Sequence, residues 1–240
     1  MSSRQRVELQ SGFVLHTHPW RETSLIVELF SRDHGRVPMV AKGARRPASA
    51  LRGVLMAFQP LLVDWSGGGE VKTLARAEWQ GGQPLLGGRA LLCGYYLNEL
   101  LIRLLPREDP HPALFEHYRE ALRRLSAGDD AQRVLRRFEL ALLQELGYGI
   151  DLATEAESGQ PVMADGRYVF IIERGVSRLE GDAGDLQVLS GRTLLALAAG
   201  DFSAAETLSQ GKSLLRRLIN HYLGGQPLQS RRVFTELMEL

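Results

Sequence analysis

The 240-residue sequence has a single cysteine, Cys93, and no long hydrophobic run. One cysteine cannot form an intramolecular disulfide, and it excludes a zinc site built from several cysteines. Cys93 lies in the apolar segment ALLCGYYLNELL, where a free cysteine is typical of a small core residue. Because no stretch of about 18 uninterrupted apolar residues is present, we expect no membrane span. The N-terminal segment MSSRQRVELQSG has no apolar stretch, so we also expect no secretory signal and a cytoplasmic protein.

The sequence also lacks the short motifs of common enzyme classes. It contains no Walker A pattern, no dinucleotide-binding glycine fingerprint, no HExxH and no nucleophile elbow. The glycine-rich SGGGE at 66–70 lies between two strand-like segments, whereas a phosphate-binding loop needs a helix N-terminus behind it. We interpret it as a hairpin turn. We therefore expect a protein without catalytic residues or cofactor, and a nucleic-acid-processing enzyme would require distant residues to converge.

Positive charge is concentrated in one part of the chain. The net charge is only +1, but residues 1–80 contain 11 Lys and Arg against seven Asp and Glu. The densest part is VAKGARRPASALRGVL at 40–55, which contains Lys42, Arg45, Arg46 and Arg52 and no acid. Glycines and a proline interrupt regular structure there. This composition fits a mobile loop that contacts phosphates, and a solvated surface loop is the alternative.

The first 80 residues have the pattern of a small β domain. Strand-like segments are GFVLHTH, which we expect to end at Pro19, then 24–31, RVPMVAK, 58–65 and 70–79. Closure into a barrel removes exposed sheet edges. Five strands with a long connection between the third and fourth favour an oligonucleotide-binding barrel, the OB-fold. An SH3-like barrel has a similar strand count and remains an alternative.

Residues 81–240 have the pattern of a helical domain. The boundary is GGQPLLGG, after which the apolar period changes from 2 to 3.6. We predict helices at 89–105, 111–126 and 131–147, the last capped by Asp130, and further helices from Ser190. Between them, residues 151–189 are rich in glycine and acids and predict a small β-hairpin insertion. The predicted class is therefore α+β, with a barrel domain and a mainly helical domain.

Several ring side chains lie near the predicted barrel surface. His16 and His18 are two residues apart, so they face the same side of a strand. That spacing suits a metal ion, although a surface strand end is the simpler interpretation. Trp20, Phe58, Trp65 and Trp79 are either core residues or platforms on which bases stack.

A second basic group lies on the predicted helix at 131–147. Arg133, Arg136 and Arg137 neighbour an apolar face that includes Leu142 and Leu146. Arginine beside an apolar groove could bind a carboxylate while an apolar side chain fills the groove. A salt-bridged surface helix is the alternative.

Several motifs, in order along the chain, resemble one known family. They are PWRETSLIVELFSRDHGRVPMVAKGARR, GEVKTL, YYLNELLIRLL, RRFELALLQELGYG and YLGGQPLQSR. Together they resemble the RecO family of bacterial recombinational-repair proteins, and the resemblance runs through both halves of the chain.

The resemblance implies an N-terminal OB-fold, a helical C-terminal domain and a function in the RecF pathway of recombination. Such a protein would bind single- and double-stranded DNA, anneal complementary strands and reside at the nucleoid. It would bind the acidic, Phe-ending tail of the single-stranded-DNA-binding protein SSB. With RecR, it would help load RecA on SSB-coated DNA. A protein-binding adaptor, whose barrel contacts a partner rather than DNA, is the alternative.

The resemblance also assigns residues. It implies DNA contacts for Lys42, Arg45 and Arg46, with Arg52 just beyond them and Lys72 on the last barrel strand. It places an SSB-tail site at Arg136 and Arg137, and we include Arg133, Leu142 and Leu146. Zinc-binding members carry four cysteines in the region matching about 155–180. This chain has Glu155, Glu157 and Met163 there instead, so we expect no metal and an insertion held by packing.

Overall fold

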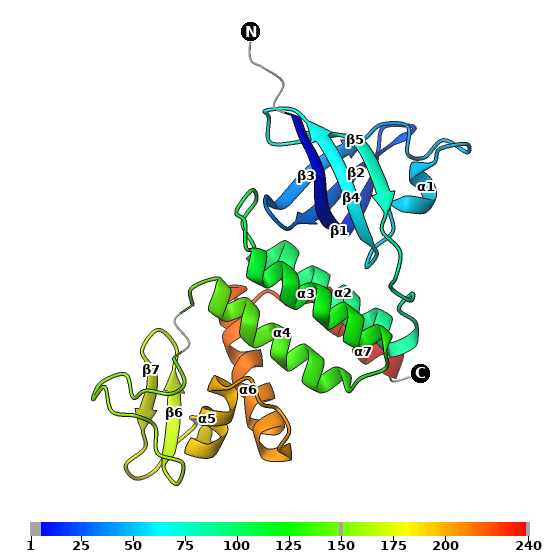
Figure 1. The fold of residues 1–240 in the computed structure, drawn as a ribbon. Helices are drawn as coiled ribbons and strands as arrows, with labels where there is room; N and C mark the ends of the chain where they lie inside the picture. The colour runs from blue at the N-terminus through cyan, green and yellow to red at the C-terminus, as the bar shows by residue number, and fades with distance from the viewer. Residues whose placement is uncertain (1–5, 149–150, 239–240) are drawn as a thin grey trace. The chain divides into compact units, whose positions relative to one another are not determined.

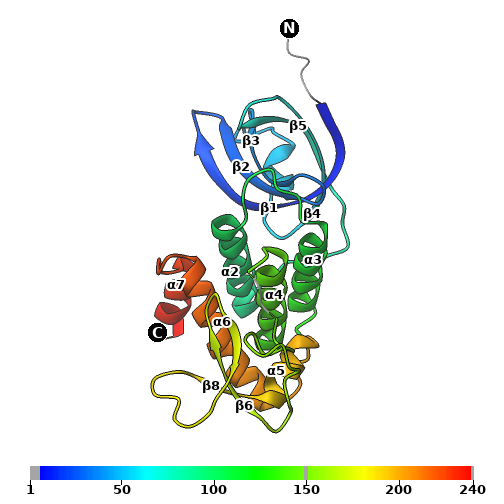
Figure 2. The same cartoon turned by 90° about the vertical axis from the view of Figure 1, so that its left-hand side faces the viewer.

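The structure, a computed structural model, describes residues 6–148 and 151–238. Gly149, which ends the motif RRFELALLQELGYG, therefore lies outside the described residues. The described residues divide into two compact units. One consists of Asp130–Pro227, and the other of the residues before Asp130 and after Pro227. Figures 1 and 2 show the elements of each unit from two directions.

Among the described residues of the first unit, five strands close into a barrel (Figure 1). They are β1 (Arg6–Trp20), β2 (Ser24–Ser31), β3 (Gly35–Ala41), β4 (Pro60–Ser66) and β5 (Lys72–Trp79). Their order is β1-β2-β3-β5-β4, and β3 and β5 are parallel whereas the other pairs are antiparallel. This is the Greek-key barrel of an OB-fold. The predicted OB-fold and the predicted hairpin turn between β4 and β5 are confirmed.

Alternation along the strands builds the core of the barrel. Val27 and Leu29 of β2 point inward and are fully buried. They belong to one apolar cluster with Val37 and Met39 of β3 and Trp65 of β4. Burying each of the aliphatic side chains contributes about 1.5–3 kcal/mol to folding. The period of two in the sequence therefore specifies which face of each strand is inside.

β1 continues beyond the predicted break at Pro19, so that prediction was wrong. Pro19 lies opposite Leu25 of β2, whereas the pairing of β1 with β4 extends only from Arg6 to Phe13. The final part of β1 thus has one neighbouring strand among those described. An edge position tolerates proline, because its missing N–H is not needed there. The strand consequently carries His16 and Trp20 in one regular stretch.

In the first unit, α3 (Pro112–Ser126) and α7 (Gln229–Met238) pack against α2 (Gly88–Leu104). The unit also contains α1 (Leu51–Val54), and the predicted helices at 89–105 and 111–126 are confirmed. On α2, the buried Asn98 amide donates to the carbonyl of Leu15 in β1 at 2.8 Å. It accepts from the Tyr118 hydroxyl of α3 at 2.5 Å, and burial raises the pKa of Tyr118. These contacts group α2 and α3 with the barrel, while a domain boundary near residue 80 stays a prediction.

Gly35 begins β3 at a position that excludes a side chain. Its φ is +65°, and a Cβ would lie 2.0 Å from the carbonyl oxygen of Asp109. We expect Gly35→Ala to lower the free energy of unfolding by about 2 kcal/mol, because the conformation is strained for alanine and the backbone opposite must move. Urea unfolding measures this. Gly53→Ala is the control, since a Cβ there meets nothing within 4 Å. Identical unfolding curves for Gly35→Ala and the unaltered protein would contradict this account.

The second unit combines three helices and a small sheet in its described residues. Its elements are α4 (Ala131–Glu145), β6 (Arg167–Ile171), β7 (Gly175–Arg178), β8 (Val188–Ser190), α5 (Gly191–Ala198) and α6 (Ala205–Tyr222). The Asp130 carboxylate accepts from the amide of Gln132 at 2.9 Å, so the predicted cap of α4 is confirmed. The sheet has the order β7-β6-β8. The predicted hairpin is therefore present as β6 and β7, and β8 adds a strand that the sequence pattern did not indicate.

Packing holds this sheet together, as the absence of cysteines led us to expect. Tyr168, Phe170 and Val176 are buried within it. The Tyr168 hydroxyl accepts from the amide of Met163 at 2.8 Å, which ties the preceding loop to β6. Within the described residues, no group of three or more His, Cys, Asp or Glu side chains is placed to hold a metal ion. None of the described helices has the length and apolar character needed to cross a membrane.

Candidate nucleic-acid interface

The basic loop follows β3 and consists of consecutive turns that lead into α1. Gly43 has a φ of +69°, which reverses the chain. Ala44 is 1% exposed and belongs to the barrel core cluster, against which Leu51 of α1 also packs. The loop that the sequence predicts to be mobile is thus anchored to the barrel at both ends.

The loop is also joined to the turn between β1 and β2. The Arg45 amide donates to the carbonyl of Thr23 at 2.9 Å. The Arg45 guanidinium donates to the carbonyl of Arg21 at 3.3 Å. Arg21 therefore lies beside the basic loop and is a candidate that sequence reasoning missed. The expected pairing of three successive strands could have identified Arg21, because it brings the 21–23 turn next to the end of β3.

Four basic side chains of this loop are exposed, and the structure describes the loop throughout. They are Lys42, Arg45, Arg46 and Arg52. None of the ion pairs found among the described residues includes any of these four side chains. A cation without a carboxylate partner has no internal ion pair to lose when a phosphate approaches. We name these four residues the basic loop cluster.

Lys72, the remaining predicted DNA contact, already has partners. Its ammonium donates to the carbonyl of Gly69 and to the carboxylate of Glu108, each at 2.8 Å. The Lys72 side chain is only 11% exposed. A phosphate would have to displace Glu108 to reach it. Lys72 stays a prediction, and its geometry suits phosphate binding less well than that of the basic loop cluster.

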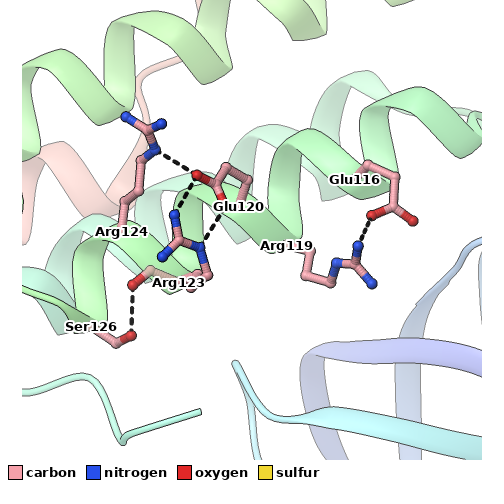
Figure 3. A network of polar contacts seen from close by, with 6 residues as sticks. All are labelled: Glu116, Arg119, Glu120, Arg123, Arg124 and Ser126. Atoms are coloured by element: carbon pink, nitrogen blue, oxygen red, sulfur yellow. Dashed lines mark hydrogen bonds and ion pairs between the residues drawn. The ribbon is translucent and has the colours of Figure 1, made fainter. Parts of the chain in front are cut away.

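Helix α3 shows how differently a set of arginines behaves when acids are nearby (Figure 3). Arg123 and Arg124 both donate to Glu120, at distances from 2.6 to 2.7 Å. Arg119 pairs with Glu116 in the same way. These arginines are compensated within their own helix, whereas the basic loop cluster is not. Charge count alone would not have separated the two groups.

The α3 network gives a pH-dependent prediction. Hydrogen bonds from Arg123 and then Arg124 lower the pKa of Glu120 to about 2. A lowered folded-state pKa stabilises the protein above the unfolded-state pKa, and the effect disappears as the pH falls towards 2. Because these pairs lie at the surface, we expect Glu120→Gln to lower the free energy of unfolding by about 0.5 kcal/mol at pH 7. Denaturation at pH 7 and near pH 2 checks this, and a deficit that persists undiminished near pH 2 would argue against it.

On α4, the structure separates the residues that the sequence grouped as one site. Arg136 is buried, and its guanidinium donates to the fully buried carboxylate of Glu139 on the same helix. Leu142 is also fully buried. Leu146, just after α4, is partly exposed. Arg136 and Leu142 are therefore buried rather than displayed on the surface of α4.

Arg133 and Arg137 remain on the surface, one helical turn apart. The Arg133 guanidinium lies 3.4 Å from the carbonyl of Ser203, and that of Arg137 lies 3.4 Å from the carbonyl of Gly200. Between these carbonyls lies Asp201, whose pKa is lowered mainly by hydrogen bonds from Ser203, with smaller contributions from both arginines. The exposed part of the predicted groove thus consists of two arginines beside the loop between α5 and α6.

The predicted stacking residues divide into two buried and two exposed side chains. Phe58 and Trp65 are 4% and 2% exposed, whereas Trp20 and Trp79 are 43% and 58% exposed. The Trp79 indole N–H donates to Gln59 at 3.0 Å.

The two histidines of the HTH motif lie in direct contact. Their ring centroids are 4.1 Å apart, and the rings meet edge to face. Burial first, and His18 second, lower the pKa of His16, while Glu28 raises it. The described residues contain no group of three or more His, Cys, Asp or Glu side chains that could hold a metal ion here, and the two rings present an aromatic surface.

Comparisons with known proteins match the whole chain. Models of the Recombination protein O N-terminal and C-terminal regions match residues 6–82 and 87–232. The DNA repair protein RecO of Aromatoleum aromaticum is 70% identical over 240 residues, which is all of both chains. RecO proteins of an Azoarcus species and of Dechloromonas aromatica are 69% and 53% identical over 243 residues, again with full coverage. The chain therefore belongs to the recombination protein O family.

Proposed function

We propose that this protein binds single- and double-stranded DNA through its barrel and acts as a mediator of DNA repair and recombination. Membership of the recombination protein O family supports the general role. The observation that carries the DNA-binding proposal is the basic loop cluster. Its four exposed cations lie on an OB-fold, a barrel that often binds oligonucleotides, and no described carboxylate is paired with them.

Phosphate neutralisation explains how such a protein would anneal strands. Lys and Arg side chains bind backbone phosphates without reading sequence, and the release of counterions drives binding. Two complementary strands held on the same cations repel each other less, so their bases can pair. This activity requires no catalytic residue, and we propose that the protein is not an enzyme.

We further propose that the second unit binds the acidic tail of SSB. Arg133 and Arg137 are the exposed candidates for carboxylates, and the partly exposed Leu146 offers apolar surface. Arg136 and Leu142 would act from the interior by holding α4 in place. We also propose that the protein acts with RecR to help load RecA, and this part of the proposal rests on family membership alone.

Binding to bare oligonucleotides tests the proposed function directly. The measurement is the fluorescence anisotropy of a labelled 30-nucleotide single strand and of its duplex, at low salt and near 0.15 M salt. We expect both to bind, with an affinity that falls steeply with salt. Annealing of two complementary labelled strands is followed by energy transfer. A protein that binds an SSB-tail peptide but neither form of DNA would instead be an adaptor, and the proposal would be wrong.

A further inference from the structure

The outer face of β1 carries three ring side chains in regular alternation. His16, His18 and Trp20 are two residues apart, and all three are exposed. Successive strand residues point to opposite faces, so these three share one face. We name them the β1 aromatic stripe. The stripe exists as one surface only because β1 continues through Pro19.

This stripe leads towards the basic loop cluster. Trp20 lies opposite Ser24 of β2, and the turn between them bonds to Arg45. In the next pair of strands, Leu25 lies opposite Ala41, and both contact the barrel interior. Lys42 is exposed and follows Ala41 in the turn after β3, so it lies at the same end of the sheet as Trp20. Rings and uncompensated cations therefore adjoin at the same end of the sheet.

At the opposite end of the stripe lies an acidic residue, Glu28, whose charge is balanced by two arginines. Glu28 lies opposite His16 and accepts from Arg36 at 3.0 Å and from Arg107 at 3.1 Å. Its charge is thus balanced, and it does not repel a polyanion from the stripe. Ile26 lies opposite His18 and pairs on its other side with Val40, which extends the apolar surface across β2 and β3.

We propose that the β1 aromatic stripe is a platform on which the unpaired bases of single-stranded DNA stack, while the basic loop cluster holds the adjoining phosphates. This inference rests on the DNA binding proposed above. Every base has a π-face, so stacking on aromatic rings tolerates any sequence. Bases in a duplex are already stacked and paired and cannot use the stripe. The stripe would therefore favour single strands, whereas the cations bind both forms.

Salt dependence separates stacking from phosphate contacts. We expect Trp20→Ala and His18→Ala each to weaken binding of an oligothymidine single strand at least about fivefold, the lower range for one stacked base. The slope of affinity against salt should not change, because no phosphate contact is removed. Duplex affinity should stay within about twofold. Trp79→Ala is the matched control, since Trp79 is also exposed but lies on β5, which does not neighbour β1.

Fluorescence reports on Trp20 without altering it. In a Trp79→Phe protein the remaining tryptophans are Trp20 and the buried Trp65. Stacking of a base should quench Trp20 emission when oligothymidine is added, and duplex DNA should quench it far less. The titration is made with EDTA present, so a metal ion on the two histidines cannot cause the change.

The outcomes distinguish this inference from the proposed function. Oligothymidine that binds without quenching Trp20, and with equal affinity for Trp20→Ala, His18→Ala and the unaltered protein, would overturn the stripe and leave phosphate binding intact. Failure of the unaltered protein to bind either form of DNA would overturn both. Weaker single-strand binding with an unchanged salt slope, together with quenching, would establish the stripe.

Discussion

Replacing Lys42, Arg45 and Arg46 together with alanine should weaken binding of single-stranded DNA about 100-fold near 0.1 M salt. Each phosphate contact contributes about 0.7 to the slope of log affinity against log salt for single strands. Loss of three contacts should therefore reduce the slope by about 2. Between 1 M and 0.1 M salt, this difference corresponds to about two powers of ten in affinity. Anisotropy titrations over a series of salt concentrations measure both quantities.

The fold should survive this triple substitution. The three side chains are exposed, and the described ion pairs do not include them. The bond from the Arg45 amide to Thr23 uses only the backbone, so alanine retains it. A thermal unfolding curve close to that of the unaltered protein would show that the loss of affinity is not a loss of structure.

Helix α3 provides a control with the same change in charge. Replacing Arg119, Arg123 and Arg124 with alanine also removes three positive charges from the first unit, but these side chains are paired with Glu116 and Glu120 (Figure 3). We expect a much smaller change in salt slope from this variant. Equal losses in both triple variants would mean that overall charge, rather than the basic loop cluster, determines binding.

The second large effect should come from the buried ion pair of α4. We expect Arg136→Met to lower the free energy of unfolding by about 3 kcal/mol at pH 7. Methionine approximates the aliphatic part of arginine, but it leaves the buried carboxylate of Glu139 without its guanidinium. Removing one partner of a buried ion pair typically costs about 3–5 kcal/mol, and we take the lower end of this range because the Arg136 side chain is still 10% exposed.

Two further variants test the origin of this loss. Adding Glu139→Gln to Arg136→Met should restore part of the stability, because no buried charge then remains. Arg137→Ala should leave stability nearly unchanged, since that side chain is exposed. Urea unfolding at pH 7 compares all three. An Arg136→Met protein as stable as the unaltered one would show that the Arg136–Glu139 pair does not stabilise the unit.

The same variants separate a structural role from a binding role. If Arg133 and Arg137 bind the SSB tail, Arg137→Ala should weaken binding of a tail peptide while DNA affinity and stability stay unchanged. Arg136→Met at a temperature where it is folded should bind the peptide more nearly like the unaltered protein. Weaker peptide binding by Arg136→Met than by Arg137→Ala would instead assign Arg136 to the peptide-binding surface.

Much of the fold follows from local patterns in the sequence. A period of two with turn residues predicted the five barrel strands, because one face of each strand must be apolar. A period of 3.6 predicted α2, α3 and α4, and the polar Asp130 predicted the start of α4. The motifs shared with the RecO family added the order of these elements. The charge of the 42–52 loop was also evident, since no acid occurs in that segment.

Tertiary packing decided which side chains are available. Glu108 compensates Lys72 from another segment, and Arg136 turns inward towards Glu139. Local sequence does not determine either orientation, because each depends on how α4 packs and where the loop after α2 lies. The continuation of β1 through Pro19 likewise brought Trp20 onto the face of His16 and His18, beside the turn that bonds to Arg45. The sequence by itself thus determined the barrel, the helices and the location of the charge. Only the tertiary structure decided which cations remain uncompensated and which rings they adjoin, because burial and ion pairing are properties of the packed chain.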